Sequence, residues 1–150
     1  MKKFLSLSLV LTMLALLLTS CSTTTIQITP ENFEQYFEIS VITEDYESDG
    51  VGILSGPSTA TVKISIVPKQ TISSGNINAV LKSSLIGWDC EYSTKKTQNG
   101  ITISDGLRVP IQFSPNQAYS KSFRIENTIG SLSEPTIKFE VVEASGTIKI

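Results

Sequence analysis

Histidine is absent from this sequence of 150 residues, and only 17% of the residues are charged. Without histidine there is no Ser-His-Asp or Cys-His nucleophile and no His-ligated zinc or iron centre. No recognisable nucleophile motif stands in their place, and the abundant Ser and Thr residues have no catalytic meaning without a base. The sequence therefore argues against an enzyme, and it gives no reason to expect a cofactor.

Basic residues are also few, with 12 Lys and Arg against 14 Asp and Glu. Lys2 and Lys3 are the only charges in the first 20 residues, so the remaining chain carries a formal charge of −4 instead of −2. Its longest basic run is the pair Lys95–Lys96. Neutralising phosphates takes clustered Lys and Arg, so a nucleic-acid partner is not expected.

The N-terminus is the most informative part of the sequence. After Met1-Lys2-Lys3 comes an apolar stretch from Phe4 to Leu18, about fifteen residues long. A short positive segment and an apolar run of this length are typical of a signal peptide. A helix of that length rises roughly 22 Å, which is short of the roughly 30 Å hydrocarbon core of a membrane.

The apolar run ends in Leu18-Thr19-Ser20-Cys21. This combination resembles the lipobox of bacterial lipoproteins, in which an aliphatic residue and two small residues precede a cysteine. The resemblance covers residues 1–21. It implies cleavage between Ser20 and Cys21 and attachment of a diacylglyceryl group to the Cys21 thiol. Two alternatives are an ordinary secretory signal with an unrelated cysteine and a retained membrane helix.

The rest of the chain predicts an all-β domain. A short helical turn is expected over residues 29–37, with Thr29 as N-cap and Pro30 in the first helical position. Beyond it, apolar residues recur at every second position, as in half-buried strands. The fold class expected is an antiparallel immunoglobulin-like β-sandwich of about seven to nine strands. The alternating sets begin at Phe37, Val62, Ile77, Ile86, Ile101, Val109, Phe123, Ile137 and Ile148.

The domain organisation expected is a signal peptide over residues 1–20, a lipid anchor and tether over 21–28, and one sandwich domain over 29–150. Turn-forming pairs separate the expected strands. Asn99-Gly100 and Asp105-Gly106 are the strongest hairpin signals among them. Others are Asp49-Gly50, Gly56-Pro57, Gly75-Asn76, Pro115-Asn116 and Ser145-Gly146.

Three features of the expected domain are candidate sites. Asp45, Glu47 and Asp49 imitate the start of a calcium loop, but Gly56 stands where a bidentate Glu is required, so a solvated turn is favoured over a metal site. Cys90 is the one cysteine left after Cys21 is acylated and is expected to be a buried, inert thiol beside a buried Trp88. Asp89 and Glu91 share one expected strand face without a pocket.

The function expected is a non-catalytic binding or interaction domain, lipid-anchored on the extracytoplasmic face of a cell membrane. Its partners would be the membrane, through Cys21, and an extracytoplasmic protein or glycan. The sequence does not distinguish an inner from an outer membrane. The alternatives are a structural accessory subunit of an envelope complex and a secreted hydrolase.

Overall fold

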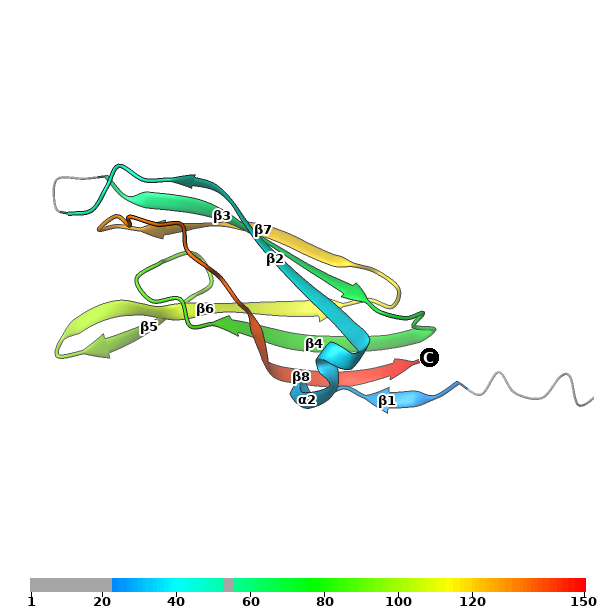
Figure 1. Cartoon of the computed structure of the whole chain (residues 1–150). Helices are drawn as coiled ribbons and strands as arrows, with labels where there is room; N and C mark the ends of the chain where they lie inside the picture. Colours follow the sequence, from blue (N-terminus) through cyan, green and yellow to red (C-terminus); the bar gives the residue numbers. More distant parts are fainter. Residues whose placement is uncertain (1–22, 53–55) are drawn as a thin grey trace, which may run out of the picture.

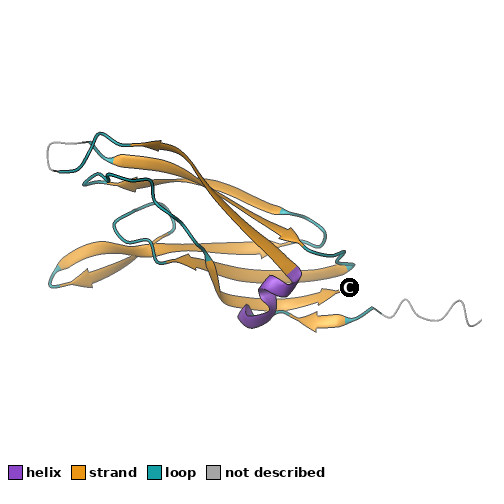
Figure 2. Ribbon diagram, in the orientation of Figure 1, coloured by secondary structure: helices purple, strands orange, loops and turns teal. Residues whose placement is uncertain are grey.

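The computed structural model describes residues 23–52 and 56–150 and places almost all regular structure in two antiparallel β-sheets (Figures 1 and 2). The larger sheet has the strand order β1-β8-β4-β6-β5, and the smaller sheet has the order β2-β3-β7. The predicted all-β class and antiparallel sandwich are confirmed. The elements are β1 (Thr25–Gln27), α2 (Pro30–Tyr36), β2 (Phe37–Glu47), β3 (Ser58–Pro68), β4 (Ser74–Ser83), β5 (Ser93–Gln98), β6 (Ile101–Phe113), β7 (Tyr119–Asn127) and β8 (Glu140–Lys149).

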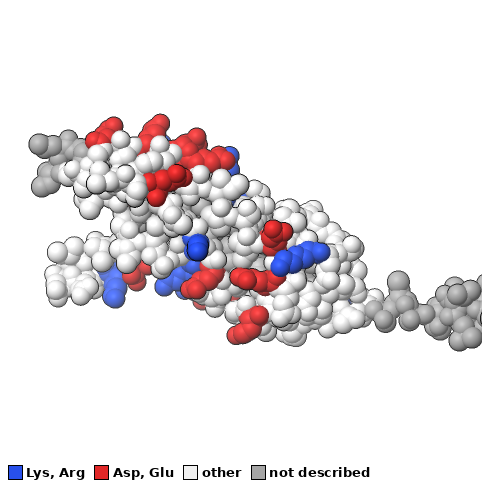
Figure 3. Space-filling view, viewed as in Figure 1, with Lys and Arg blue, Asp and Glu red and all other residues white. Residues whose placement is uncertain are grey.

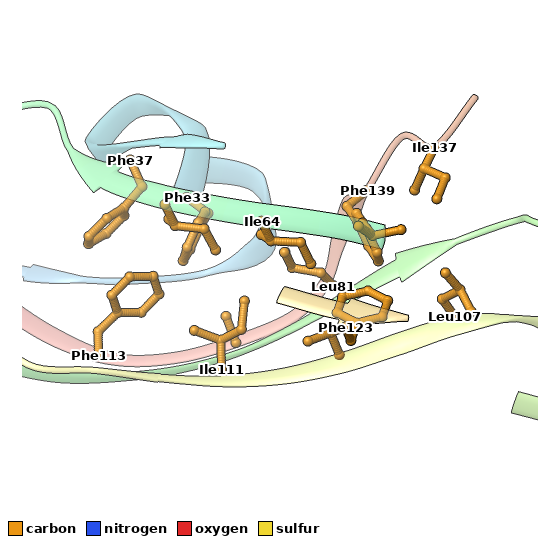
Figure 4. Packing of buried hydrophobic residues seen from close by; sticks show 14 of the residues in the cluster. Phe33, Phe37, Ile64, Leu81, Leu107, Ile111, Phe113, Phe123, Ile137 and Phe139 are labelled. Atoms are coloured by element: carbon orange, nitrogen blue, oxygen red, sulfur yellow. The ribbon is translucent and has the colours of Figure 1, made fainter. Parts of the chain in front are cut away.

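The core lies between the two sheets, and the alternating apolar residues of the central strands supply it (Figure 4). Every second side chain of a strand points to the same face, so one face of each sheet is apolar. On β3 and β4 this predicted alternation is confirmed, because its inward members are buried: Val62, Ile64, Ile66, Ile77, Ala79 and Leu81.

One end of the core is closed by aromatic rings from α2, β2 and β6. Phe33 of α2 stacks on Phe37 with ring centroids 4.7 Å apart, and Phe113 of β6 lies 5.1 Å from Phe37. The helix begins with Pro30 in its first turn and Thr29 as N-cap. The Thr29 N–H donates to Asn32 Oδ1 at 2.9 Å, which satisfies a backbone donor that the helix cannot pair. The predicted helix over 29–37 is thus confirmed, with bounds of 30–36.

The two strongest hairpin signals had opposite outcomes. Asn99 and Gly100 both have positive φ, 53° and 77°, and form the two-residue turn between β5 and β6. Asp105-Gly106 lies inside β6, at the point where the register with β5 shifts between Ser93 and Lys95. A Cβ at residue 106 would meet the Ser83 carbonyl oxygen at 2.3 Å. Gly106 therefore marks a β-bulge and a close approach of two strands, and the predicted turn is wrong.

The sequence also predicts turns at Gly75 and Gly146, but both residues lie inside paired strands. A Cβ on Gly75 would meet the Thr147 carbonyl oxygen at 2.2 Å, and one on Gly146 would meet that of Asn76 at 2.1 Å. Glycine at these positions lets β4 and β8 approach closely. A sequence pattern does not separate this use of glycine from its use in a turn.

The strand expected from Ile86 to Tyr92 is wrong. These residues form a connection between β4 and β5, and its one β-bridge to the smaller sheet in the described part of the chain joins Asp89 to Glu126. Trp88 is nevertheless buried, as predicted, whereas Ile86 is 68% exposed. Ile101 and Ile103 belong to a strand as expected, but they are 66% and 43% exposed because β5 and β6 extend as a two-stranded arm.

Candidate interaction surface

Cys21 and the predicted signal peptide lie outside the described residues, so the structure gives only the position of the chain that follows them. Thr24 exchanges two backbone hydrogen bonds with Ile150, of 3.1 and 3.0 Å, and β1 continues this pairing along β8. The described chain thus enters the sandwich at the end that also holds residue 150 (Figure 1). No helix in the described part is long and apolar enough to cross a membrane.

The acidic segment 44–50 is not the turn that its composition indicated. Residues 44–47 are the last part of β2, with a bulge at which Asp45 takes a φ of 53°. Glu44 forms an ion pair with Lys63 of β3. Among the described residues, no three His, Cys, Asp or Glu side chains gather as metal ligands would. Asp45, Glu47 and Asp49 therefore do not meet in a common site, because a strand spaces its side chains along its length.

Hydroxyl groups hold the loops that follow β2 and β7 together. Ser58 is fully buried; its Oγ accepts from the Ser131 N–H at 2.7 Å, and its hydroxyl donates to Ser48 Oγ at 2.7 Å. Tyr46 and Ser48 donate to the Ser131 carbonyl oxygen at 2.8 and 2.5 Å. This cluster could not be predicted, since serines about ten and seventy residues apart carry no local signal in the sequence.

These hydrogen bonds position apolar side chains that point into solvent. Val51 pairs with Gly130 in an isolated bridge, and the Gly52 N–H donates to the Ile129 carbonyl oxygen at 3.2 Å. Val51 is 55% exposed, Ile129 69% and Leu132 85%. A monomeric protein seldom gathers large exposed apolar residues in one place without a use for them. Ile129 and Leu132 stand among turn-forming residues, which is the one local signal that could have revealed them.

The β5–β6 turn lies at the same end of the molecule as these loops, and the N-terminal entry lies at the opposite end (Figure 1). Ile101 directly follows that turn and adds a further exposed apolar side chain. We call this end the distal surface and define it by Val51, Ile101, Ile129 and Leu132. It combines apolar side chains with loops that hydrogen bonds hold in place, a combination that suits binding.

Cys90 lies on the connection between β4 and β5, half-buried and free. Its N–H donates to Asp89 Oδ1 at 2.9 Å and to Ser93 Oγ at 2.6 Å, and its sulfur accepts from the Tyr92 N–H at 3.2 Å. Burial raises the pKa of the Cys90 thiol. The thiol is therefore protonated at neutral pH, which makes it a poor nucleophile.

Asp89 and Glu91 do not form an acid–base pair, because each faces a different lysine. Lys95 Nζ lies 2.8 Å from Asp89 Oδ2, and Lys121 Nζ lies 3.9 Å from Glu91 Oε1. The hydrogen bond from Lys95 is the main cause that lowers the pKa of Asp89. Both carboxylates are thus compensated surface charges without a shared pocket.

A groove of about 470 Å³ runs beside β2 on the open side of the sandwich. Ile39 and Val41 of β2 form one wall, and the segment with Ile137 and Phe139, which leads from β7 to β8, forms the other. Acidic side chains gather along β2 and the loop after it, over the upper edge of the molecule in Figure 3.

Comparison with protein-family models, curated proteins and solved structures finds no match to this chain.

Proposed function

We propose that this chain is a lipid-anchored, extracytoplasmic, non-catalytic interaction domain, tethered to a cell membrane through Cys21. One observation supports it best: the described chain enters the sandwich at one end, and the distal surface lies at the other. An anchored domain built in this way presents its exposed apolar side chains away from the membrane. Because loops on a rigid scaffold commonly carry binding residues, the distal surface is the proposed contact for an extracytoplasmic protein or glycan.

Lipid attachment at Cys21 would make the anchoring permanent. Two or three acyl chains, at about 0.8 kcal/mol for each buried methylene, hold a protein at a bilayer, whereas one chain does so only reversibly. The sequence from Ser22 to Thr24 is polar and uncharged, which suits a short tether between the lipid and β1.

The same proposal extends to an immunoglobulin-like architecture. Apart from the three-residue β1, the sheets hold four and three strands, the numbers of a constant-type immunoglobulin domain. The order β8-β4-β6-β5 differs from the ABED order of that domain. We therefore propose that this domain resembles an immunoglobulin domain in having two packed sheets with these numbers of strands. It does not resemble one in the order of its strands.

Metabolic labelling with a palmitate analogue tests the anchor in cells that make the full chain. We expect label in the wild type and none in Cys21→Ala, and equal label in both would refute lipid attachment.

Photocrosslinking tests the distal surface in the same cells. A photoreactive amino acid at Leu132 is expected to give a discrete crosslinked species, and the same group at Asn78, exposed on β4, is expected to give none. Equal crosslinking from both positions, or none from Leu132, would contradict the proposed surface.

A further inference from the structure

The outer edge of β2 has backbone groups that pair with nothing. β2 is the first strand of the smaller sheet and pairs only with β3. The Lys69 N–H donates to the Tyr36 carbonyl oxygen at 2.8 Å, and Phe37 stands opposite Pro68, which has no N–H to donate. Hydrogen-bonded and non-hydrogen-bonded pairs alternate in an antiparallel ladder. Ile39, Val41 and Thr43 therefore direct their N–H and C=O groups away from β3.

In the described part of the chain, no hydrogen bond joins those outward groups to another segment. The Phe37 N–H is already used, since it donates to the Phe33 carbonyl oxygen. The open edge thus runs from Ile39 to Thr43, a length of about 13 Å at roughly 3.3 Å per residue. Such an edge is a template on which another strand can pair.

The groove beside this edge determines the side chains that an added strand would carry. Ile39 and Val41 line one side of it, and Ile137 and Phe139 line the other. Alternate side chains of an added strand would point into this groove, where these four residues supply apolar surface between the charged residues Glu34, Glu38, Lys69 and Lys138. The others would point outward, beside Glu38 and Ser40, which are exposed on β2.

Two further edges are protected in ways that β2 is not. β5 is six residues long and carries Lys95 and Lys96. On β7, Glu126 exchanges two hydrogen bonds with Asp89, of 2.7 and 2.9 Å, and the Tyr92 ring packs on Phe123 with centroids 5.3 Å apart. Lysines and covering segments are usual ways to prevent a strand edge from pairing.

The charge along β2 selects the partner. α2 and β2 contain no Lys or Arg, and they carry six acidic residues: Glu31, Glu34, Glu38, Glu44, Asp45 and Glu47. Lys63, Lys69 and Lys138 are the basic residues beside them. If two copies paired antiparallel about Val41, Glu38 of each would face Glu44 of the other. Opposed like charges are unfavourable, so the edge disfavours a second copy and favours a basic strand.

We propose that the β2 edge binds an extended segment of another protein in which apolar residues alternate with Lys or Arg. The segment pairs with Ile39, Val41 and Thr43 as a fourth strand of the smaller sheet. Its apolar side chains enter the groove toward Ile137 and Phe139, and its basic side chains lie beside the acidic residues of β2. This inference depends neither on the lipid anchor nor on the distal surface.

The test measures binding of labelled ten-residue peptides to the full-length chain in detergent by fluorescence anisotropy. A peptide that alternates Val and Lys is expected to bind, and one that alternates Val and Glu is not. Two versions of the Val–Lys peptide carry N-methyl groups on alternate residues, one version for each edge of the strand. One of them is expected to bind about tenfold more weakly, because its methyl groups face β2 and remove its hydrogen bonds.

Variants of the protein test the same contact. Thr43→Pro removes an outward N–H and is expected to weaken binding of the Val–Lys peptide about tenfold, whereas Thr43→Val, which keeps that N–H, is expected to bind as the wild type does. Asp45→Asn with Glu47→Gln should weaken binding, and Asp105→Asn with Glu140→Gln should not.

The proposal would be overturned if the Val–Lys peptide did not bind, if both N-methylated peptides bound equally, or if the Val–Glu peptide bound as well as the Val–Lys peptide. A dimer of the unliganded chain that Thr43→Pro abolishes would assign the edge to a second copy and overturn it as well.

Discussion

The two ends of the sandwich are closed by different means. At the end where the chain enters, Phe33, Phe37 and Phe113 lie with ring centroids 4.7 to 6.1 Å apart, and all three are buried. At the distal end, hydrogen bonds from Ser48 and Ser58 hold the loops, and large apolar side chains remain in solvent. Aromatic burial stabilises the fold and leaves little surface to recognise. Hydroxyl groups fix a loop without consuming its apolar residues, which remain free to bind.

The largest expected effect is at the aromatic end. Phe33→Ala should lower the free energy of unfolding by about 3–5 kcal/mol, because a buried ring leaves a cavity. Leu132→Ala at the distal end is the matched control and should change it by less than about 0.5 kcal/mol. Urea denaturation of a chain that begins at residue 22 measures both. Similar losses in the two variants would mean that the ends do not differ as described.

Trp88 is a second buried aromatic residue whose loss should destabilise the fold. It lies on the connection between β4 and β5 and not on a strand. Its side chain is 4% exposed, and its carbonyl oxygen accepts a hydrogen bond from Ser104 Oγ at 2.5 Å. Trp88→Ala should cost about 3 kcal/mol, toward the lower end for a buried aromatic, since a connection adjusts to a cavity more readily than a paired strand does. Circular dichroism during denaturation measures it. A change below about 1 kcal/mol would show that the connection closes around the cavity.

Ser58 tests the hydroxyl-held end. In Ser58→Ala the Ser131 N–H loses its acceptor, which should cost about 1–3 kcal/mol. Hydrogen exchange should quicken at residues 128–133 before it changes in the β5–β6 hairpin. Ser133→Ala, at an exposed position, is the control. Unchanged exchange at residue 131 in Ser58→Ala would show that this hydroxyl does not hold the loop.

The smallest expected effect is a change in the pKa of one exposed carboxyl group, that of Asp89. Lys95→Met removes the group that chiefly lowers the pKa of Asp89, so that pKa should rise toward its ordinary value. The stability that the lowered pKa contributes is present above the unfolded-state pKa and is lost as the pH falls through the folded-state one. The wild type should therefore lose this small advantage over Lys95→Met in acid. An NMR titration of Asp89 measures the change, and Lys96→Met should leave it unaltered.

Strand identity could be predicted wherever a strand covers the core. Val62, Ile64 and Ile66 alternate with polar residues because one face of β3 is buried, and burial is what the pattern reports. Ile101 and Ile103 belong to a strand but their side chains are exposed, since the arm formed by β5 and β6 reaches beyond the core. Alternation of apolar and polar residues thus predicts an extended backbone more reliably than it predicts burial of the apolar side chains.

Glycines and acidic residues were the main source of error. Gly106 and Gly146 serve close approaches between strands, which depend on partners far away in the sequence. Residues 44–47 looked like a turn by composition, yet β2 continues through them beside β3. The open edge of β2 could not be read from sequence either, because it depends on which strands β2 pairs with.

The pairing of Thr24 with Ile150 gives the molecule a mechanical property. If the chain is held at Cys21 and a partner pulls at the distal surface, tension enters through β1, which runs from the end where the described chain enters toward the distal end (Figure 1). The hydrogen bonds that join β1 to β8 lie across the axis of β1, as they do in any antiparallel pair. The load therefore shears these bonds together instead of opening them one after another. A strand of three residues, with the Ile28 N–H bonded to the Gly146 carbonyl oxygen behind it, serves as a clamp against tension on the tether.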